Sequence, residues 1–418
     1  MNPEYPKLRY GLEATPIERD GGSFFLLHDR LGYEKESLLV SPPVLRLLAE
    51  MNGGNSLRDL QAFFMKMTGD LLLMEELGKI LHLLDDKRFL ENDRYRTFVE
   101  SEILRFKADP IRRMRHAGKS YPEDPATLRA ELGGLFDSRA EPGAPDAKCA
   151  NGRLVGLVAP HIDIRAGSGC FARAYKACLE TIPPRIWVIL GTGHEPIPNH
   201  FALLDKSFET PLGIVGCDRE SCEFLRQYAP RNILAGCYNH RMEHSVEFQA
   251  VFLALTQPTA RIVPLLCSFS EDDWRRDRTY IDEVSDLLQE LVDTRGEPVG
   301  LLASVDLAHI GPRYGDAFVP DRNTVESHLS ADRLLLKMVE ECRAADFMDE
   351  IVRNGNSRRI CGTAPLYTMA RVLEGTARGQ VLDHSYSPAD NQNSFVTFAG
   401  MAFYETKVEG AYGWKTEE

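Results

Sequence analysis

The sequence predicts an α/β protein, in which a parallel sheet carries helices on its faces, preceded by a smaller α+β unit. Three observations lead to this fold class. Short, fully apolar runs typical of buried strands recur after residue 153. Segments with the apolar spacing of helices separate these runs. The chain has 418 residues, more than one ordinary hydrophobic core uses, so two domains are expected.

The expected large domain covers residues 151–408. Its strand-like runs are RLVGLVAP, RIWVILG, RIVPLLCSF and VGLLASVD, and helical spacing occurs in FARAYKACLE, SVEFQAVFLAL and RTYIDEVSDLLQELV. Two closing strands, GQVLDHSYS and SFVTFAGMAFYE, are expected near the end of the chain. This alternation indicates crossover connections, and such sheets bind ligands at the carboxyl ends of their strands.

Residues 1–100 form a separate unit in this interpretation. Two expected strands, GGSFFLLHD and ESLLVS, precede three expected helices, SPPVLRLLAEM, NSLRDLQAFFMKM and MEELGKILHLLDDKRFLEND. Ser41 is the expected cap of the first helix, which has prolines in its first turn and which Gly53 and Gly54 should end. The order of elements indicates a winged-helix-like domain. Residues 101–150 then form a helical linker with a loop rich in Pro, Gly and Ala.

Charge argues against nucleic acid as a partner. The net charge is −13, and residues 1–100 hold 13 Lys and Arg against 17 Asp and Glu. A winged helix often binds DNA, but neutralisation of phosphates supplies most of that affinity. No apolar run approaches the roughly 20 residues that span a bilayer. The first residues lack the basic-then-apolar layout of a signal peptide. We therefore expect a cytoplasmic protein with no nucleic-acid or membrane partner.

The nine cysteines are dispersed, and no two of them form a C-x-x-C pair. In a reducing compartment this distribution argues against a disulfide framework, and the spacing indicates neither a zinc ribbon nor an iron–sulfur cluster. Cys361 differs from the rest because it precedes the helical segment of RRICGTAPLYTMARVL. A thiol at a helix N-terminus has a lowered pKa and is a better nucleophile or metal ligand. The alternative for Cys361 is a small buried residue.

Histidines and carboxylates gather where predicted strands end or a predicted helix starts. These residues are His161 and Asp163, His194 and Glu195, Glu243, His244 and Glu247, and Asp306 and His309. One histidine at a strand end is usually solvated, but four such clusters are hard to explain in that way. Imidazole is the commonest metal ligand in proteins, and carboxylates orient it from behind. The pattern therefore predicts a metal site at this edge of the sheet.

From about residue 112 to about residue 406 the sequence resembles the Memo family, whose bacterial and archaeal members are called AmmeMemoRadiSam system protein B. The motifs that carry the resemblance are RHAGKSYP with LRAELGGLF, APHIDIRAGS, VILGTGHEP, EHSVEFQ, SVDLAHIGPRYGD and CGTAPLY, in this order. The family's frequent PHAGY is replaced in this chain by PHIDIRAG, so Asp163 adds a carboxylate near the expected site.

The stretch SLLVSPPVLRLLAEMNGGNSLRDLQAFF, continuing to LLDDKRFLE, resembles PqqD-like winged-helix domains. Those domains hold precursor peptides for modifying enzymes, often radical-SAM enzymes. The alternative for this unit is a helical cap that stabilises or dimerises the main domain.

The Memo resemblance implies a fold similar to the class III extradiol dioxygenases, which hold non-haem Fe(II) with two histidines and a glutamate. In the Memo family a cysteine takes the place of the glutamate. The resemblance implies that His161, His194 and Cys361 are the metal ligands. It places Asp306 and His309 along the site, with His309 where the dioxygenases keep an acid/base histidine and with His244 close by.

The expected function is that of a redox or oxygen-dependent metalloprotein. Fe(II) is the expected metal, with Cu or Zn as alternatives, because two imidazoles and a thiolate suit all three. His309, Asp306 and His244 are the candidate catalytic residues, with His309 moving a proton that Asp306 orients. A radical-SAM protein and a peptide or small-molecule substrate are the expected partners. The alternatives are a zinc-dependent hydrolase and a non-catalytic peptide-binding adaptor with a vestigial metal site.

Overall fold

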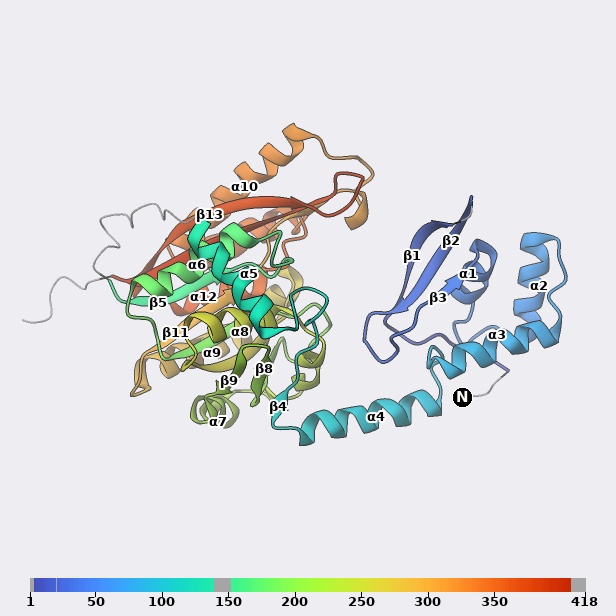
Figure 1. Cartoon of the computed structure of the whole chain (residues 1–418), viewed down its shortest axis with the longest axis horizontal. Helices are drawn as coiled ribbons and strands as arrows, with labels where there is room; N and C mark the ends of the chain where they lie inside the picture. Colours follow the sequence, from blue (N-terminus) through green and yellow to red (C-terminus); the bar gives the residue numbers. More distant parts are fainter. Residues whose placement is uncertain (1–3, 20, 139–151, 407–418) are drawn as a thin grey trace, which may run out of the picture. The chain divides into compact units, whose positions relative to one another are not determined.

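The computed structural model describes residues 4–19, 21–138 and 152–406. The chain divides after Asp109 into two compact units, which are described separately below (Figure 1). The prediction of an α/β domain preceded by a small unit with its own sheet is confirmed. The domain boundaries that we expected at residues 100 and 150 stay predictions. Most of the expected Pro-, Gly- and Ala-rich loop lies outside the described residues.

The described residues of the first unit form a three-stranded antiparallel sheet and four helices. The strands, in the order β1-β2-β3, are β1 (Leu12–Arg19), β2 (Gly22–Asp29) and β3 (Leu38–Val40). The helices are α1 (Pro42–Ala49), α2 (Leu57–Thr68), α3 (Met74–Asp86) and α4 (Asp93–Ala108). Leucines at helical spacing fill its core, and Leu47, Leu60 and Leu77 are fully buried. The unit therefore has a hydrophobic core of its own.

Helix α1 starts where the sequence predicts, with prolines in its first turn, and it ends before the expected glycines. Ser41 occupies the N-cap position, but its side chain makes no capping hydrogen bond. The helix ends at Ala49, before Gly53 is reached. The capping interaction lies instead at α2, where the Ser56 side chain accepts a hydrogen bond from the Asp59 amide, and the Asp59 carboxylate accepts one from the Ser56 amide.

The described residues of the second unit form an 11-stranded mixed sheet with the order β12-β14-β5-β11-β6-β10-β9-β8-β4, in which β13 also pairs with β14 and β7 with β10. The four central strands are parallel. They are β5 (Leu154–Ala159), β11 (Val299–Ser304), β6 (Ile186–Thr192) and β10 (Arg261–Cys267). Almost every residue in them is buried, as their apolar sequences predict.

Further strands extend both sides of this centre. They are β4 (Ile111–Arg112), β7 (Phe201–Leu203), β8 (Ser207–Thr210), β9 (Gly213–Cys217), β12 (His309–Ile310), β13 (Ala377–Pro388) and β14 (Phe395–Glu405). The last two are the expected closing strands, and β14 runs antiparallel to β5. The parallel centre thus has an antiparallel flank, which makes the sheet mixed.

Helices cover both faces of the sheet (Figure 1). On one face lie α5 (Pro125–Ser138), α6 (Ser168–Glu180) and α8 (Ser245–Thr256). The other face carries α7 (Arg219–Tyr228), α9 (Glu271–Thr294), α10 (Arg322–Glu340), α11 (Ala344–Asn354) and α12 (Thr363–Val372). Gly191 in β6 lets α8 approach closely, since a Cβ atom there would lie 2.6 Å from Cγ2 of Val246.

Candidate metal centre

The order of the central strands brings separate parts of the chain to one edge of the sheet. The strands β5, β11 and β6 are neighbours, and each is followed two residues later by a polar residue: His161, Asp306 and His194 respectively. Cys361 lies two residues before α12, which packs on β11 and β6. The carboxyl ends of the strands therefore meet the start of a helix at the place where α/β proteins bind ligands.

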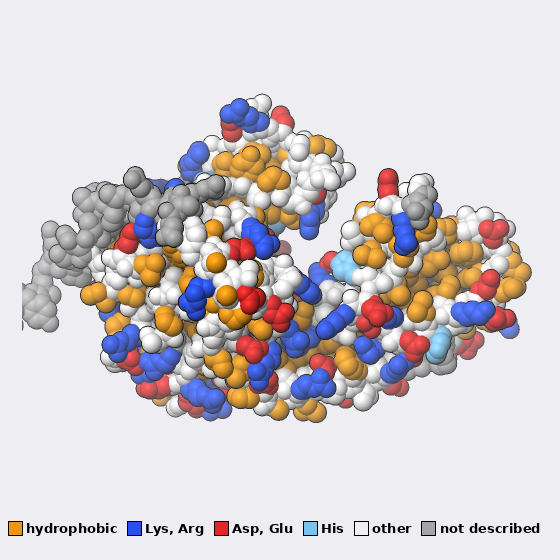
Figure 2. Space-filling view, viewed as in Figure 1, with side chains coloured by type: hydrophobic (Ala, Val, Ile, Leu, Met, Phe, Trp, Pro, Cys, Tyr) orange, Lys and Arg blue, Asp and Glu red, His pale blue; other side chains and the backbone are white. Residues whose placement is uncertain are grey.

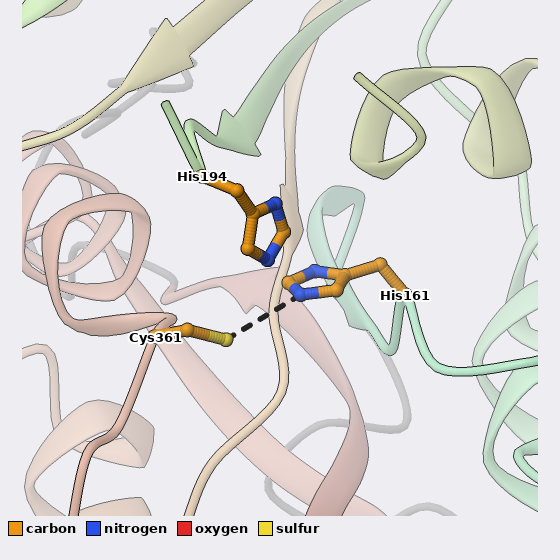
Figure 3. Close-up of side chains that lie close together, drawn as sticks. All are labelled: His161, His194 and Cys361. Atoms are coloured by element: carbon orange, nitrogen blue, oxygen red, sulfur yellow. Dashed lines mark hydrogen bonds between the residues drawn. The ribbon is translucent and has the colours of Figure 1, made fainter. Parts of the chain in front are cut away.

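Three side chains from these segments point toward one another (Figure 3). His161, His194 and Cys361 each offer one ligand atom, and these atoms all lie within 4.8 Å of one another. The Cys361 Sγ atom is 3.4 Å from Nε2 of His161. The two imidazole rings are nearly perpendicular, with centroids 5.0 Å apart. Two nitrogens and one sulfur at this spacing suit a single metal ion of the iron, copper or zinc type.

The His161 ring is fixed by the carbonyl of the neighbouring strand. Its Nδ1 atom lies 3.0 Å from the carbonyl oxygen of Ser304, so Nδ1 carries the proton and donates it. The other ring nitrogen, Nε2, then faces Cys361. His161 is 2 % exposed, which adds to the rigidity of this ligand.

The Glu243 carboxylate fixes the His194 ring in the way that the Ser304 carbonyl fixes His161. The Nδ1 atom of His194 lies 3.1 Å from each carboxylate oxygen of Glu243. The Glu243 carboxylate also accepts backbone N–H bonds from His194, His244 and Ser245. A carboxylate held in this way aims the remaining ring nitrogen of the histidine at the metal position and raises its basicity.

A second group, formed by His194, Glu243 and His244, also has ligand atoms within 4.8 Å of one another. The carboxylate of Glu243 is already occupied by N–H donors, and the His244 ring stacks on His194 with centroids 4.9 Å apart. This group therefore fits a wall that supports His194 better than it fits a second metal ion. Burial lowers the pKa of His244 well below its ordinary value, so its ring is neutral.

Electrostatics favour the thiolate form of Cys361. Burial acts to raise the pKa of the thiol, but His161 and His194 beside it outweigh burial and lower the pKa to about 7. Burial likewise acts to lower the pKa of His194, but the Glu243 carboxylate and Cys361 together outweigh burial and hold that pKa well above its ordinary value. The thiolate is the form of cysteine that binds metals.

Asp306 contacts the first histidine from the side. Its Oδ1 atom accepts the backbone N–H groups of His161 and Ile162 at 3.1 and 3.3 Å. Its Oδ2 atom lies 3.6 Å from Nε2 of His161. Burial raises the pKa of Asp306 to about 6. The carboxyl group is thus able to hold or release a proton near neutral pH beside the metal position.

His309 opens the short strand β12 and lies outside the group of three ligands. Its Nδ1 atom donates to the carbonyl of Leu307 at 3.0 Å, which leaves the ring's lone pair on Nε2. Burial lowers the pKa of His309, so the ring is neutral and able to accept a proton. The ring of Tyr314 lies against it, with centroids 5.1 Å apart.

A buried polar network holds α8 against the strand ends. The side-chain amide of Gln249 donates to the carbonyl of Pro160 at 2.8 Å and to the Ser304 hydroxyl at 2.7 Å. The Tyr175 hydroxyl donates to the amide oxygen of Gln249, and the Ser304 hydroxyl donates to the carbonyl of Ser245. All these side chains are buried. The network fixes β5, β11 and α8 to one another directly behind the ligands.

A second buried network anchors the segment that precedes α5. The Glu247 carboxylate pairs with Arg112 and accepts hydrogen bonds from the Tyr121 hydroxyl and the backbone N–H of His116. Both charged side chains are at most 1 % exposed. The His116 ring then packs against His244, with centroids 5.7 Å apart. This part of the chain thereby forms one side of the candidate centre.

The structure therefore brings together His161, His194 and Cys361, with Asp306 and His244 beside them. Asp163 is exposed, and its carboxylate accepts the N–H of Arg165. Among the described residues, neither Asp163 nor Glu195 belongs to a group of three potential ligands. Glu243 was expected among the carboxylates that orient histidines at this edge, and the structure shows that it holds His194. The roles of Gln249 and His116 were not anticipated.

The fold and the site define a class of protein: an α/β protein with a candidate mononuclear metal centre at the carboxyl edge of its sheet. The sequence model described as "Memo-like protein" matches residues 112–402. The chain belongs to the Memo family. A MEMO1 family protein of Aquifex aeolicus is 26 % identical over 401 residues, which cover 96 % of this chain and 100 % of the relative.

Two further relatives agree with this assignment. A MEMO1 family protein of Thermus thermophilus is 29 % identical over 331 residues, covering 79 % of this chain and 94 % of the relative. A MEMO1 family protein of Methanopyrus kandleri is 27 % identical over 301 residues, covering 69 % and 96 %. In the described part of the chain, no helix combines the length and the apolar character that crossing a membrane demands.

Proposed function

We propose that this Memo-family protein is a redox metalloprotein that binds one iron or copper ion through His161, His194 and Cys361 and reacts with oxygen. The observation that carries the proposal is the convergence of these three ligand atoms within 4.8 Å from segments far apart in the sequence. Two imidazoles and one anionic ligand on one side of a metal leave positions open for oxygen and substrate. The proposed relation to extradiol dioxygenases rests on the resemblance of the Memo family to their fold, with Cys361 in the place of their glutamate.

The protein residues around the ligands fit the proposal. When bound, such a metal supplies electron transfer and a site for oxygen. The neutral His309 ring, with Nδ1 held by Leu307, provides its Nε2 atom as a proton acceptor. Asp306, with its pKa raised by burial to about 6, provides a second site where a proton is held. The open side of the centre is accessible to solvent, since the His194 side chain is 37 % exposed.

The test begins with the metal. The full chain is expressed and purified without oxygen, and the metal content of wild type and of the Cys361→Ala variant is measured by elemental analysis. We expect iron or copper near one per chain in the wild type and its loss in the variant. Zinc in that place would overturn the redox proposal and favour a hydrolase. Absence of metal from both proteins would overturn the ligand assignment.

The second step tests reactivity and the role of His309. Oxygen uptake by the reduced, metal-loaded protein is measured for wild type and His309→Ala. We expect uptake that depends on the metal and falls about 100-fold in the variant, because general acid–base groups contribute about 10²–10⁴-fold. Equal metal content in the two proteins is the control. Metal-loaded wild type that consumes no oxygen would contradict the proposal.

The division into two units favours a second candidate, a peptide-binding adaptor. The first unit has its own hydrophobic core, and hydrophobic side chains gather on its surface in Figure 2. Met65, Leu71, Leu73 and Met74, around the α2–α3 connection, are each at least 45 % exposed. Exposed apolar groups of this kind are typical of interaction surfaces. In this proposal the unit holds a peptide, and a radical-SAM partner modifies it.

A peptide array separates this candidate from the first. An adaptor binds the same peptides with His161→Ala as with wild type, and Leu71→Ser weakens that binding at least tenfold. The adaptor function would be contradicted if His161→Ala no longer bound the peptides and Leu71→Ser still bound them. That result would place peptide recognition at the metal centre.

A further inference from the structure

Two cysteines far from the metal ligands in the sequence lie in contact with each other. The Sγ atoms of Cys217 and Cys222 are 3.5 Å apart. Cys217 is the last residue of β9, and Cys222 lies in the first turns of α7. A disulfide requires an S–S distance of about 2.05 Å, so the two sulfurs need to approach by roughly 1.5 Å. Rotation about the Cα–Cβ bonds supplies movements of this size.

The turn between the two cysteines is firmly held. Asp218 caps α7 by accepting the N–H of Ser221 at 2.9 Å, and its carboxylate pairs with Arg261 at 3.0 Å. The N–H of Cys217 donates to the Ser207 hydroxyl at 3.1 Å. These contacts fix the backbone on both sides of the pair, so the two thiols are kept together rather than meeting by chance.

The pair is asymmetric in a way that suits stepwise oxidation. Cys217 is half-buried, whereas Cys222 is 2 % exposed and packs in the hydrophobic core. An oxidant in solution therefore meets Cys217 first. The hydrogen bond with Cys217, together with burial, raises the pKa of the Cys222 thiol, so Cys222 stays protonated until its neighbour has reacted. An accessible thiol with a second thiol beside it is the arrangement of reversible redox sites.

A metal site explains the pair less well. Within residues 4–19, 21–138 and 152–406, neither sulfur belongs to a group of three potential metal ligands. Two sulfurs alone do not provide the four ligands of a structural zinc site. Over the same ranges, no cysteine takes part in a disulfide.

We propose that Cys217 and Cys222 form a redox-active dithiol that a peroxide oxidises to an intramolecular disulfide, fastening the end of β9 to α7. The Cys217 thiolate attacks a peroxide oxygen, the O–O bond breaks, and Cys217 becomes a sulfenic acid while hydrogen peroxide is reduced to water. The Cys222 sulfur then attacks the Cys217 sulfur. The S–OH bond breaks, and the hydroxide takes the Cys222 proton and leaves as a second water. Two thiols lose two electrons, and one peroxide gains them.

The sequence offers a direct readout of this disulfide. Arg219 lies between the two cysteines, so trypsin separates them into the peptides Ser207–Arg219 and Glu220–Arg226. The reduced full chain, treated with chelator, is exposed to hydrogen peroxide, alkylated and digested. We expect mass spectrometry to find these two peptides joined, and the joined species to disappear after dithiothreitol. In Cys361→Ala, which lacks the reactive thiol of the candidate metal centre, thiols titrated in denaturant should fall by two, from eight to six.

Matched variants decide whether the pair is specific. Cys237→Ser removes another half-buried cysteine and should leave the cross-link unchanged. Cys222→Ser should abolish the cross-link and leave Cys217 oxidised to sulfinic or sulfonic acid. Tryptophan fluorescence of the variants checks that they are folded. The proposal is overturned if the folded wild type gives no joined peptides, or if Cys217 is joined to any other cysteine.

Discussion

The Cys361 thiol lies 3.4 Å from Nε2 of His161, although 200 residues separate the two along the chain. The two residues lie on separate elements of the fold. His161 is placed by the end of β5 and Cys361 by the turn before α12. The contact therefore depends on the packing of α12 against the sheet. Changes to this packing should alter the affinity of the site for its metal.

Gly362, next to Cys361, is a position where that packing is tight. A Cβ atom there would lie 2.5 Å from Cβ of Val305 and 2.9 Å from the carbonyl oxygen of Asp306. We expect Gly362→Ala to displace Cys361 and to weaken metal binding at least tenfold, because ligand geometry controls affinity. The metal affinity is measured by competition with a chelating dye.

Gly133→Ala is the control for this substitution. No heavy atom lies within 4 Å of the Cβ position in the middle of α5. Alanine should therefore stabilise that helix by up to about 1 kcal/mol and leave metal affinity unchanged. Full metal affinity in Gly362→Ala would show that the turn before α12 does not fix Cys361.

Glu243 should matter for metal binding without being a ligand. In Glu243→Gln, a neutral amide replaces the carboxylate that accepts the hydrogen bond from Nδ1 of His194. The hydrogen bond becomes weaker, and the His194 ring becomes less basic. We expect affinity for the metal to fall about 10–100-fold, the usual effect of losing a carboxylate behind a ligating histidine. Metal-binding isotherms of the two proteins measure the change.

The matched substitution is Glu223→Gln, which removes an exposed carboxylate that pairs with Arg226 on α7. It should leave the isotherm unchanged. Complete loss of metal in Glu243→Gln, as great as in His194→Ala, would mean instead that Glu243 is itself a ligand.

Substitution of Cys361 should lower the metal affinity more than substitution of Glu243 does. Removing a ligand atom leaves two of three donors, so Cys361→Ser should weaken binding by more than the roughly 100-fold limit for residues behind the ligands. Cys217→Ser, which also removes a half-buried thiol, should retain wild-type affinity. Competition titrations over the same metal concentrations measure the metal affinity of wild type and both variants. Equal affinities for wild type and Cys361→Ser would show that Cys361 is not a ligand.

Glu247 should make the second unit sensitive to acid. Burial acts to raise the pKa of this carboxylate, but Arg112, His116 and the Tyr121 hydroxyl together outweigh burial and lower it below the ordinary value of 4.5. The ionised form therefore stabilises the folded state fully above that value, and the contribution is lost as pH falls through the folded pKa. At neutral pH, Glu247→Gln leaves Arg112 buried without its partner, which should cost about 3–5 kcal/mol.

Tryptophan fluorescence in urea measures this change, because all three tryptophans lie at positions 187, 274 and 414, beyond the first unit. The stability difference between wild type and Glu247→Gln should be constant from pH 7 to about pH 5 and shrink below pH 4.5. A difference that grows on acidification would contradict a stabilising role of the ionised carboxylate. Glu209→Gln, at a partly exposed carboxylate, serves as the control.

Much of the fold could be predicted because its signals are local. The runs LVGLVA and IWVILG contain no polar side chain, since both faces of a central parallel strand are covered. Helix α8 carries ten buried residues and begins at the segment we expected. The strand β1 was missed, since its residues are mostly exposed and show no apolar alternation. The short strands β4 and β12 contain two residues each, too few for any pattern.

The sequence alone determined the α/β class and a row of polar residues at one edge of the sheet, because strand ends follow from neighbouring residues. The choice of His161, His194 and Cys361 as ligands came from the resemblance to the Memo family. Tertiary structure decided which polar groups support these ligands. Glu243 holds His194, and Ser304 holds His161, through contacts across 49 and 143 residues. Such pairs form only when the order β5-β11-β6 and the packing of α8 are in place, since hydrogen bonds between distant residues depend on the whole fold.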